Sequence, residues 1–432
     1  VMELSSSKTT APSLKEEAVW ALNTAKTNGI LGSEDTAAIF HSFDTHRRYV
    51  AHLAESFSSH PRSLHTLAIK TNPHPAILKQ VVEWGFGLEA ASMEEVHLAL
   101  NAGCPSNRVV FDSPVKTQRE IDMCNQHEGL RGIILNVNTL EELQRVPVES
   151  PNFVVGLRIN PMVDTGAPDI FHVSSNESKF GVPISERKLI LEAILRFPIT
   201  QLHVHSGTAM SNLDSAVGAV KSLVGLAKEA NEQLRAAGID RSIGSIDIGG
   251  GLRPETLSCD KPSRMQYYAA SLEKECPDLW DDFQLVTEFG QWSYFYSGYA
   301  HSQVEYAIQR GESRIVYVHL GADFLMRDVY NKKPRGVEFV PMRQSAVLAD
   351  EKEVKTDIAG PLCFAGDYLE KGLMMPRLEE GDELLLLNTG SNAFGLWSRH
   401  CSRTIPQMIG VYENEKRLVC MSPRFNPFLN MM

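Results

Sequence analysis

The chain has 432 residues, 43% of them hydrophobic and 22% charged, and its formal net charge at pH 7 is -11. This length and apolar content are sufficient for two or three domains with a large core. The acidic balance, with no dense lysine and arginine tract to offset it, argues against nucleic acid or an anionic membrane as a partner.

The cysteines and the hydropathy favour a reducing compartment. Seven cysteines are scattered along the chain without C-x-x-C pairs or a cysteine and histidine cluster of zinc spacing, so we expect no metal site. No run approaches the roughly eighteen apolar residues of a membrane span, and the opening segment lacks the apolar region of a secretory signal. The cytoplasm is the expected location, and an organelle matrix is the alternative if a transit peptide has been removed.

Short β-rich runs alternate with longer helical patterns over the first two thirds of the chain. The expected strands are 66–70, 87–90, 109–111, 132–137, 153–159, 200–204, 245–248 and 285–288. The expected helices between them include 75–84, 93–102, 118–125, 140–146, 186–196 and 213–237. Eight strand and helix units in succession predict a (β/α)8 barrel, which is an α/β fold.

After about residue 300 the pattern changes to short strands divided by Gly, Pro and Asp, without long helices between them. This pattern predicts an antiparallel β domain at 301–432. The barrel then occupies 36–300, and a flexible or helical extension occupies 1–35. The run 37–43 also has the pattern of a strand and is a candidate for the β domain, because a barrel that starts at residue 66 leaves it without a neighbour.

The chemistry of a (β/α)8 barrel is placed at the C-terminal ends of its strands. Five of these ends carry titratable or glycine residues, namely Lys70, Glu89, His205, the run Gly249, Gly250 and Gly251, and Glu288. An aldehyde cofactor needs an amine for a Schiff base, and its phosphate needs backbone N–H groups that glycine leaves accessible. A lysine alone is usually a solvated loop residue and a glycine run alone is usually a turn, but together on one face they predict pyridoxal 5′-phosphate (PLP).

Several blocks also occur in a specific order and spacing over nearly the whole chain. They are LAIKTNP, LHVHSGTAM, SIDIGGGL, VTEFGQW and GPLCFAGDYL. They resemble the YAVKAN, LHxHIGSQ, glycine, EPGR and GPxCxSxD blocks of the fold type III PLP-dependent decarboxylases, the ornithine/diaminopimelate/arginine decarboxylase family. The resemblance implies a (β/α)8 barrel followed by an antiparallel β domain, as in alanine racemase and ornithine decarboxylase. It also implies an amino-acid α-decarboxylase that releases CO2 and leaves an amine.

The resemblance further implies a role for each matched residue. Lys70 forms the Schiff base, Glu288 holds the proton of the pyridine nitrogen, His205 stacks on the ring and Thr208 donates to the phosphate. Cys363 reaches the active site of a partner subunit and protonates Cα there after CO2 leaves, so a homodimer with a shared active site is expected. The plain alternatives are a glutamate paired with a barrel cation, a core histidine and a buried structural thiol.

Two positions near the expected phosphate differ from the family pattern. Gly290 matches the glycine of EPGR, but Gln291 stands where that block has its arginine. Asn392 stands where the family has the tyrosine of its GAY segment. The phosphate therefore loses a charge-assisted partner and a hydroxyl, which weakens the expected affinity for the cofactor.

A third difference concerns the substrate. Phe364 occupies the position where diamino-acid decarboxylases carry an acidic residue for the distal ammonium, so plain ornithine or lysine is disfavoured unless Asp367 or Asp323 takes over. Arg327 is a candidate ligand for a distal carboxylate, and an ordinary surface pair with Asp328 is the alternative. A dicarboxylic amino acid or an amino-acid conjugate fits this pattern.

Two other functions stay open at this point. A racemase or epimerase on the same fold is disfavoured, because alanine racemases pair the pyridine nitrogen with an arginine where this chain has Glu288. A catalytically silent regulator would account for the altered phosphate residues, but Lys70, Glu288 and Cys363 argue against it.

Overall fold

A computed structural model describes residues 13–149, 151–168, 173–175, 177–258, 260–331, 336–349 and 352–423. The first twelve residues and Cys259 therefore lie outside the described residues. The chain divides into two compact units, a barrel unit at Arg47–Phe295 and a sheet unit made of Val1–His46 and Tyr296–Met432. Within the described ranges, none of the helices has the length and apolar character needed to cross a bilayer.

The barrel unit contains a closed ring of eight strands. They are β2 (Ser63–Ala68), β3 (Gly87–Ala90), β4 (Val109–Phe111), β5 (Ile134–Val137), β6 (Val154–Asn160), β8 (Ile199–His203), β9 (Ser245–Asp247) and β10 (Gln284–Glu288). Each strand pairs in parallel with the next, β10 pairs with β2 to close the ring, and the short β7 (Val182–Pro183) extends β6. The predicted (β/α)8 barrel is confirmed.

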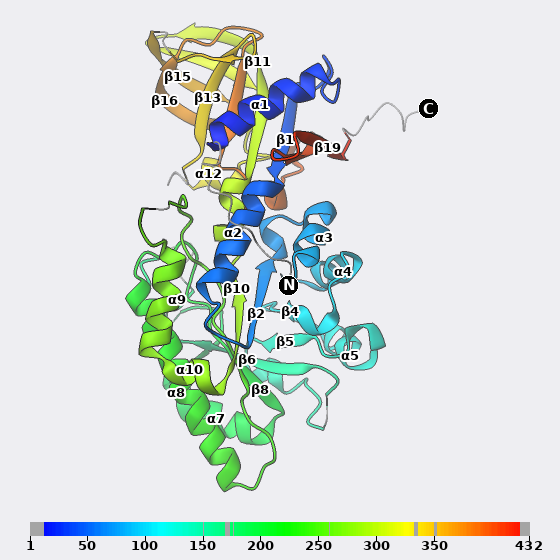
Figure 1. The fold of residues 1–432 in the computed structure, drawn as a ribbon, viewed down its shortest axis with the longest axis vertical. Coiled ribbons are helices and arrows are strands. Elements are labelled where there is room, and N and C mark those ends of the chain that lie inside the picture. The colour runs from blue at the N-terminus through cyan, green and yellow to red at the C-terminus, as the bar shows by residue number, and fades with distance from the viewer. Residues whose placement is uncertain are drawn as a thin grey trace. The chain divides into compact units, whose positions relative to one another are not determined.

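Helices surround this ring, with α3 to α5 on one side and α7 to α10 on the other (Figure 1). They are α3 (Pro75–Glu83), α4 (Met93–Asn101), α5 (Gln118–Gln126), α6 (Leu140–Leu143), α7 (Arg187–Arg196), α8 (Leu213–Ala236), α9 (Arg264–Glu275), α10 (Pro277–Asp282) and α11 (Gln291–Tyr294). Side chains of Ser92, Thr117, Asn212 and Ser263 accept a backbone N–H at the start of α4, α5, α8 and α9. These caps fix where the helices begin, because the first N–H groups of a helix have no partner within it.

The inside of the barrel is layered, because every second residue of a strand points to the same face. An apolar cluster contains Leu64, Val110, Ile134 and Val286 from four different strands. Two residues further along these strands, or just past their ends, stand Thr66, Asp112, Asn136 and Glu288. The barrel therefore has an apolar layer below and a polar layer at the C-terminal ends of the strands, which is where the candidate site lies.

The sheet unit contains a ten-stranded sheet. Its strands are β1 (Ala37–Ser42), β11 (Gly298–Arg310), β12 (Ser313–Val318), β13 (Glu338–Arg343), β14 (Ala346–Val347), β15 (Glu353–Ala359), β16 (Tyr368–Pro376), β17 (Glu383–Leu387), β18 (Gln407–Tyr412) and β19 (Arg417–Ser422). Most pairs are antiparallel as predicted, but β1 pairs in parallel with β18 and β12 pairs in parallel with β15. These partners are far apart in the sequence, so no tight hairpin turn imposes an antiparallel direction on them.

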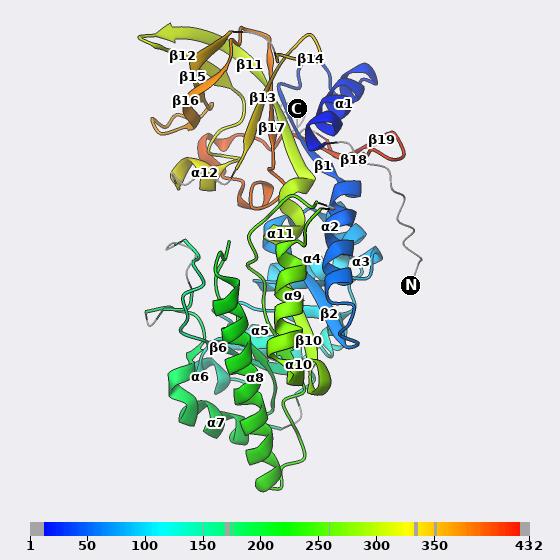
Figure 2. The same cartoon turned by 60° about the vertical axis from the view of Figure 1, so that its left-hand side comes forward.

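Helix α1 (Leu14–Thr27) lies beside the strands of the sheet unit (Figure 2), and its buried alanines and Leu22 pack in one apolar cluster with Phe40, Tyr299 and Leu385. A capping box at Ser13 starts this helix. The sheet unit also contains the short α12 (Met326–Tyr330), and α2 (Phe43–Ser56) continues from the sheet unit into the barrel unit.

Candidate active site

Lys70 lies in a single 3-10 turn, Ile69–Thr71, directly after β2. Its Nζ donates to both carboxylate oxygens of Glu89, at 2.7 and 2.5 Å, and Glu89 is fully buried on β3 while the Lys70 side chain is 52% exposed. Burial by itself lowers the pKa of Lys70, but Glu89 and Glu288 outweigh it and raise that pKa above its ordinary value. The amine thus lies at the mouth of the barrel and faces the carboxylates rather than the surrounding helices.

Glu288 ends β10 and is buried. Its Oε1 has no hydrogen-bond partner among the described residues. Burial, reinforced by Asp247, raises the pKa of Glu288 well above its usual range. A buried carboxyl with an oxygen left over is costly unless a further group pairs with it, so this atom marks a place for a ligand that shares a proton.

His205 follows β8, and its Nδ1 accepts the backbone N–H of Gly250 at 3.2 Å. Burial, with Arg158 and His203 nearby, lowers the pKa of His205 well below its ordinary value. The imidazole is therefore neutral, and because Nδ1 is an acceptor its proton is on Nε2. A flat, neutral ring fixed by a backbone amide is suited to stack on a cofactor ring.

The glycine run after β9 leaves no room for side chains. A Cβ on Gly250 would lie 2.4 Å from the carbonyl oxygen of Glu288, and one on Gly251 would lie 1.8 Å from the carbonyl oxygen of Gly207. Gly251 also has φ +92°, a conformation that favours glycine. The close approach of three loops at this point explains why these positions are glycine.

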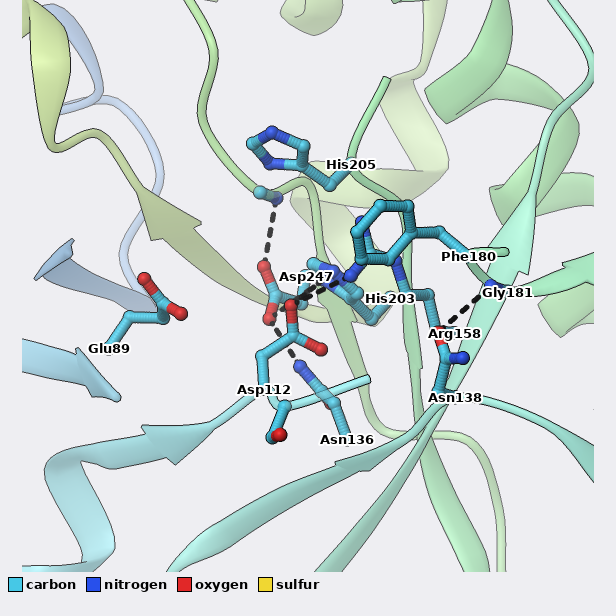
Figure 3. Close-up of polar contacts among 12 residues, drawn as sticks. Glu89, Asp112, Asn136, Asn138, Arg158, Phe180, Gly181, His203, His205 and Asp247 are labelled. Carbon is cyan, nitrogen blue, oxygen red and sulfur yellow. Dashed lines mark hydrogen bonds and ion pairs between the residues drawn. The ribbon is translucent and has the colours of Figure 1, made fainter. Parts of the chain in front are cut away.

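A buried charge network that the sequence analysis did not identify lies next to these groups (Figure 3). His203 Nδ1 lies 3.1 Å from Asp247 Oδ2, and His203 Nε2 lies 3.5 Å from Asp112 Oδ2. Asp112 Oδ2 also pairs with Arg158 Nη1 at 3.1 Å, and Asn136 Nδ2 donates to Asp247 Oδ2 at 3.1 Å. All five side chains are buried.

The two-residue periodicity of the strands could have predicted this network from the sequence. His203 stands two residues before His205, and Asp247 stands two residues before Gly249, so each pair shares the inward face of its strand. Arg158 is a charged residue inside an apolar strand, GLRIN, where a charge is rare unless it is paired. Its guanidinium also lies over the ring of Phe180, 4.4 Å from the ring centroid.

Three other barrel residues predicted to bind the cofactor lie in the segments that follow β8 and β10. Gln291 begins α11 after Gly290, and its Oε1 has no hydrogen-bond partner among the described residues. A Cβ on Gly290 would lie 2.3 Å from Thr71 Oγ1, so this loop packs against the turn that carries Lys70. Thr208 lies in the loop after β8 and is partly buried.

The predicted substrate residues and the predicted catalytic Cys363 lie in the sheet unit. Cys363 is exposed, and its backbone N–H faces Cys401 Sγ at 3.4 Å. Phe364 stacks on Tyr330, with ring centroids 5.3 Å apart and an interplanar angle of 18°, and lies 6.4 Å from the ring of His400. The position predicted to lie near the distal end of the substrate is therefore part of an aromatic stack.

The two candidate replacement acids have other partners. Asp367 is buried and accepts the backbone N–H groups of Ala322 and Leu362, both at 2.7 Å. Asp323 accepts two backbone N–H groups and lies 3.4 Å from the guanidinium of Arg403. Both carboxylates therefore stabilise loops of the sheet unit, which argues against the predicted rescue of a distal ammonium by either of them.

Two predicted residues of the sheet unit remain. Arg327 lies on α12 and is partly buried. Asn392 is buried with φ 52°, a left-handed conformation that asparagine adopts more readily than the tyrosine expected there.

The barrel thus brings together an amine, a buried carboxyl with an available oxygen, a neutral imidazole and a glycine loop. These are the groups that a phosphorylated aldehyde with a pyridine ring requires, so the site fits PLP. Residues 46–293 match the family described as the pyridoxal-dependent decarboxylases, over its pyridoxal binding domain. The chain belongs to this family of PLP-dependent carboxy-lyases.

Three similar proteins illustrate the relationship. A diaminopimelate decarboxylase of Aquifex aeolicus is 27% identical over 339 residues, which are 77% of this chain and 76% of that protein. An L-glutamyl-[BtrI acyl-carrier protein] decarboxylase of Niallia circulans is 26% identical over 331 residues, 73% of this chain and 74% of that protein. The crystal structure of diaminopimelate decarboxylase from Helicobacter pylori complexed with L-lysine has a TM-score of 0.79 at 22% identity and covers 93% of this chain and 97% of that chain, which confirms the fold.

Proposed function

We propose that this chain is an amino-acid α-decarboxylase whose substrate has no free ammonium at its distal end, the distal group being a carboxylate or an acylated amine. The observation that carries this proposal is the stacking of Phe364 on Tyr330, because aromatic rings at the position where diamino-acid decarboxylases carry an acid give a distal ammonium no counter-charge. The name of the Niallia circulans relative, which acts on a glutamyl group attached to a carrier protein, agrees with a conjugated substrate.

The barrel residues take the following roles in this proposal. Lys70 supplies the amine that bonds to the cofactor aldehyde, and Glu89, whose pKa burial raises, is placed to accept the proton that this amine loses. Gly249, Gly250, Gly251 and Thr208 hold the phosphate. His205 supports the ring, and Glu288 shares a proton with the pyridine nitrogen through its unpartnered oxygen. The bound cofactor supplies an electron-accepting ring for the electron pair that remains at Cα when CO2 leaves.

The substrate preference can be tested with matched pairs of amino acids. We expect purified, cofactor-loaded protein to release CO2 faster from Nε-acetyl-lysine and Nδ-acetyl-ornithine than from lysine and ornithine, and to accept glutamate over diaminopimelate. Acylation removes only the distal charge, so each pair isolates the feature that Phe364 is proposed to select against. Faster turnover of the free diamines would contradict the proposal.

We also propose a homodimer in which Cys363 of one subunit completes the site of the other and protonates Cα. The exposed thiol of Cys363 supports this role, since a structural cysteine is normally buried. The test mixes two deficient variants, Lys70→Ala and Cys363→Ala. A dimer that shares its sites recovers at most about a quarter of the normal activity on mixing, since half of the dimers are mixed and each has one intact site. No recovery after subunit exchange would mean that each chain carries a complete site.

A reducing location such as the cytoplasm is also part of the proposal. It agrees with the six described cysteines, all of which are free thiols.

A further inference from the structure

His203 is enclosed by charged groups that stand on, or directly after, four other strands. Asp112, Arg158, Asp247, Glu288 and the neutral His205 surround it, and Lys70 with Glu89 form the next pair at the mouth of the barrel. Asp112, His203 and Glu288 each offer an atom within 4.8 Å of the others. This grouping includes the carboxyl proposed to share its proton with the cofactor.

Both ring nitrogens of His203 face carboxylates. Nδ1 lies 3.1 Å from Asp247 and Nε2 lies 3.5 Å from Asp112. Neither contact has hydrogen-bond geometry, but two carboxylates this close to one buried ring favour the charged imidazolium, which has a proton on each nitrogen. The neighbouring carboxylates accordingly outweigh burial and raise the pKa of His203 well above its ordinary value.

The carboxylates on either side of His203 are themselves fixed. Asp247 accepts Asn136 Nδ2 at 3.1 Å and the backbone N–H of Gly249 at 2.9 Å. Asn136 in turn accepts from Gln201 at 2.9 Å. On the other side, Arg158 and His203 oppose the effect of burial and hold the pKa of Asp112 well below its ordinary value. The carboxylate of Asp247, next to His203, is therefore held by a polar network that reaches the glycine loop.

We propose that His203 is a positioning residue whose imidazolium, fixed between Asp247 and Asp112, compensates the negative charge that Glu288 acquires when its proton passes to the pyridine nitrogen. In this step the O–H bond of Glu288 breaks, an N–H bond forms at the pyridine, and no other reactant is consumed. The inference rests on the cofactor of the family and on the proposed role of Glu288, but not on the proposed substrate.

The charges of the described groups show why a cation is needed. Lys70 and Glu89 form a pair whose charges cancel, both before and after the proton passes from the amine to the carboxylate. When Glu288 is ionised, three further carboxylates face one another across this layer, namely Asp112, Asp247 and Glu288. Arg158 and a protonated His203 supply two positive charges, and the pyridine proton supplies the third. With a neutral His203 one carboxylate has no counter-charge. Glu288 would then keep its proton, and the pyridine ring would stay neutral and accept electrons poorly.

The first test uses the cofactor-free protein labelled with ¹⁵N-histidine, with His203 assigned by comparison with His203→Gln. We expect both ring nitrogens of His203 to give protonated signals throughout the range in which a free imidazole loses its proton. A deprotonated nitrogen signal at neutral pH would overturn the proposal. One equivalent of bound metal in elemental analysis would also overturn it, since the same three side chains would then be a metal site.

The second test reads the cofactor without any substrate. With PLP labelled at the pyridine nitrogen, we expect a protonated signal in the natural protein and an unprotonated one in His203→Gln. His65→Gln is the matched control, because His65 is a partly buried barrel histidine that bonds to Thr287. The inference fails if the pyridine stays protonated in His203→Gln. If the natural protein itself shows an unprotonated pyridine, the proposed role of Glu288 fails as well.

Discussion

The glycine loop gives the sharpest steric prediction, at Gly250. A Cβ at this position would lie 2.4 Å from the carbonyl oxygen of Glu288 and 2.9 Å from its carbonyl carbon. Ordinary contacts of this kind begin near 3.4 Å, so Gly250→Ala must displace the backbone of Glu288 by about 1 Å, at a typical cost of about 1–3 kcal/mol. Since a barrel of this size loses roughly 2–4 °C per kcal/mol, its midpoint should fall by about 2–12 °C.

The same displacement moves the carboxyl that faces the cofactor. If the strain destabilises the PLP-bound protein by about 2 kcal/mol more than the cofactor-free protein, the affinity for PLP falls by up to roughly thirtyfold. Thermal unfolding with and without PLP, together with a fluorescence titration of the cofactor, measures both quantities. The expected signature is a lower midpoint and a smaller stabilisation by PLP.

Gly244→Ala is the control for this substitution. Gly244 is exposed just before β9, and an added Cβ there meets nothing within 4 Å. This variant should bind PLP normally and keep its midpoint. The steric reasoning is wrong if Gly250→Ala equals Gly244→Ala in both measurements.

Three further predictions concern other parts of the chain. Lys70→Ala should abolish CO2 release and prevent covalent trapping of PLP by borohydride, which mass spectrometry detects; a trapped adduct at the usual yield would exclude Lys70 as the attachment point. Phe364→Glu should shift the substrate ranking toward distal amines, while Tyr306→Glu, at an exposed aromatic residue of the same unit, should leave it unchanged; an unchanged ranking in both variants would remove Phe364 from the specificity argument. Burial, followed by the charges of nearby groups, lowers the pKa of His65 from 6.5 to about 4, so its neutral form contributes stability above pH 6.5 that is lost as the pH falls toward 4. This loss is up to about 3 kcal/mol, and urea unfolding at both ends of this range should show a smaller loss for His65→Gln.

The barrel could be predicted because its local signals agree with its pairing. Each strand is a short, largely apolar run, five of the predicted strands end at or near a titratable residue or glycine, and the neighbour of each strand in the ring is the next long strand in the sequence. Parallel pairing also brings all eight C-terminal ends to one face. Lys70, Glu89, His205 and Glu288 could therefore be placed on one face from the sequence.

The sheet unit was harder to predict, because its pairing is long-range and its strands are less apolar. Strands β15 (EVKTDIA) and β16 (YLEKGLMMP) carry charges and a glycine, and they were not identified from the sequence. The parallel pairing of β1 with β18 joins segments more than 350 residues apart, which no local pattern encodes. The partners of Asp323 and Asp367 are backbone amides of loops, and these too become visible only in the folded unit.

The buried charges also bear on whether the protein is a silent regulator. Removing ionised groups from water costs several kcal/mol each, and replacing a buried ion pair with apolar side chains of similar volume is often neutral or stabilising. A barrel that only had to fold would gain nothing from burying Asp112, Arg158, His203 and Asp247 together beneath a half-exposed lysine. These buried charges are explained if they stabilise the charge of a bound ligand. The favourable interaction with that ligand then offsets the free-energy cost of burying them. The buried charges therefore favour an active enzyme over a silent regulator. The charge that distinguishes a decarboxylase from a racemase is then at Glu288, which we propose shares a proton with the pyridine nitrogen.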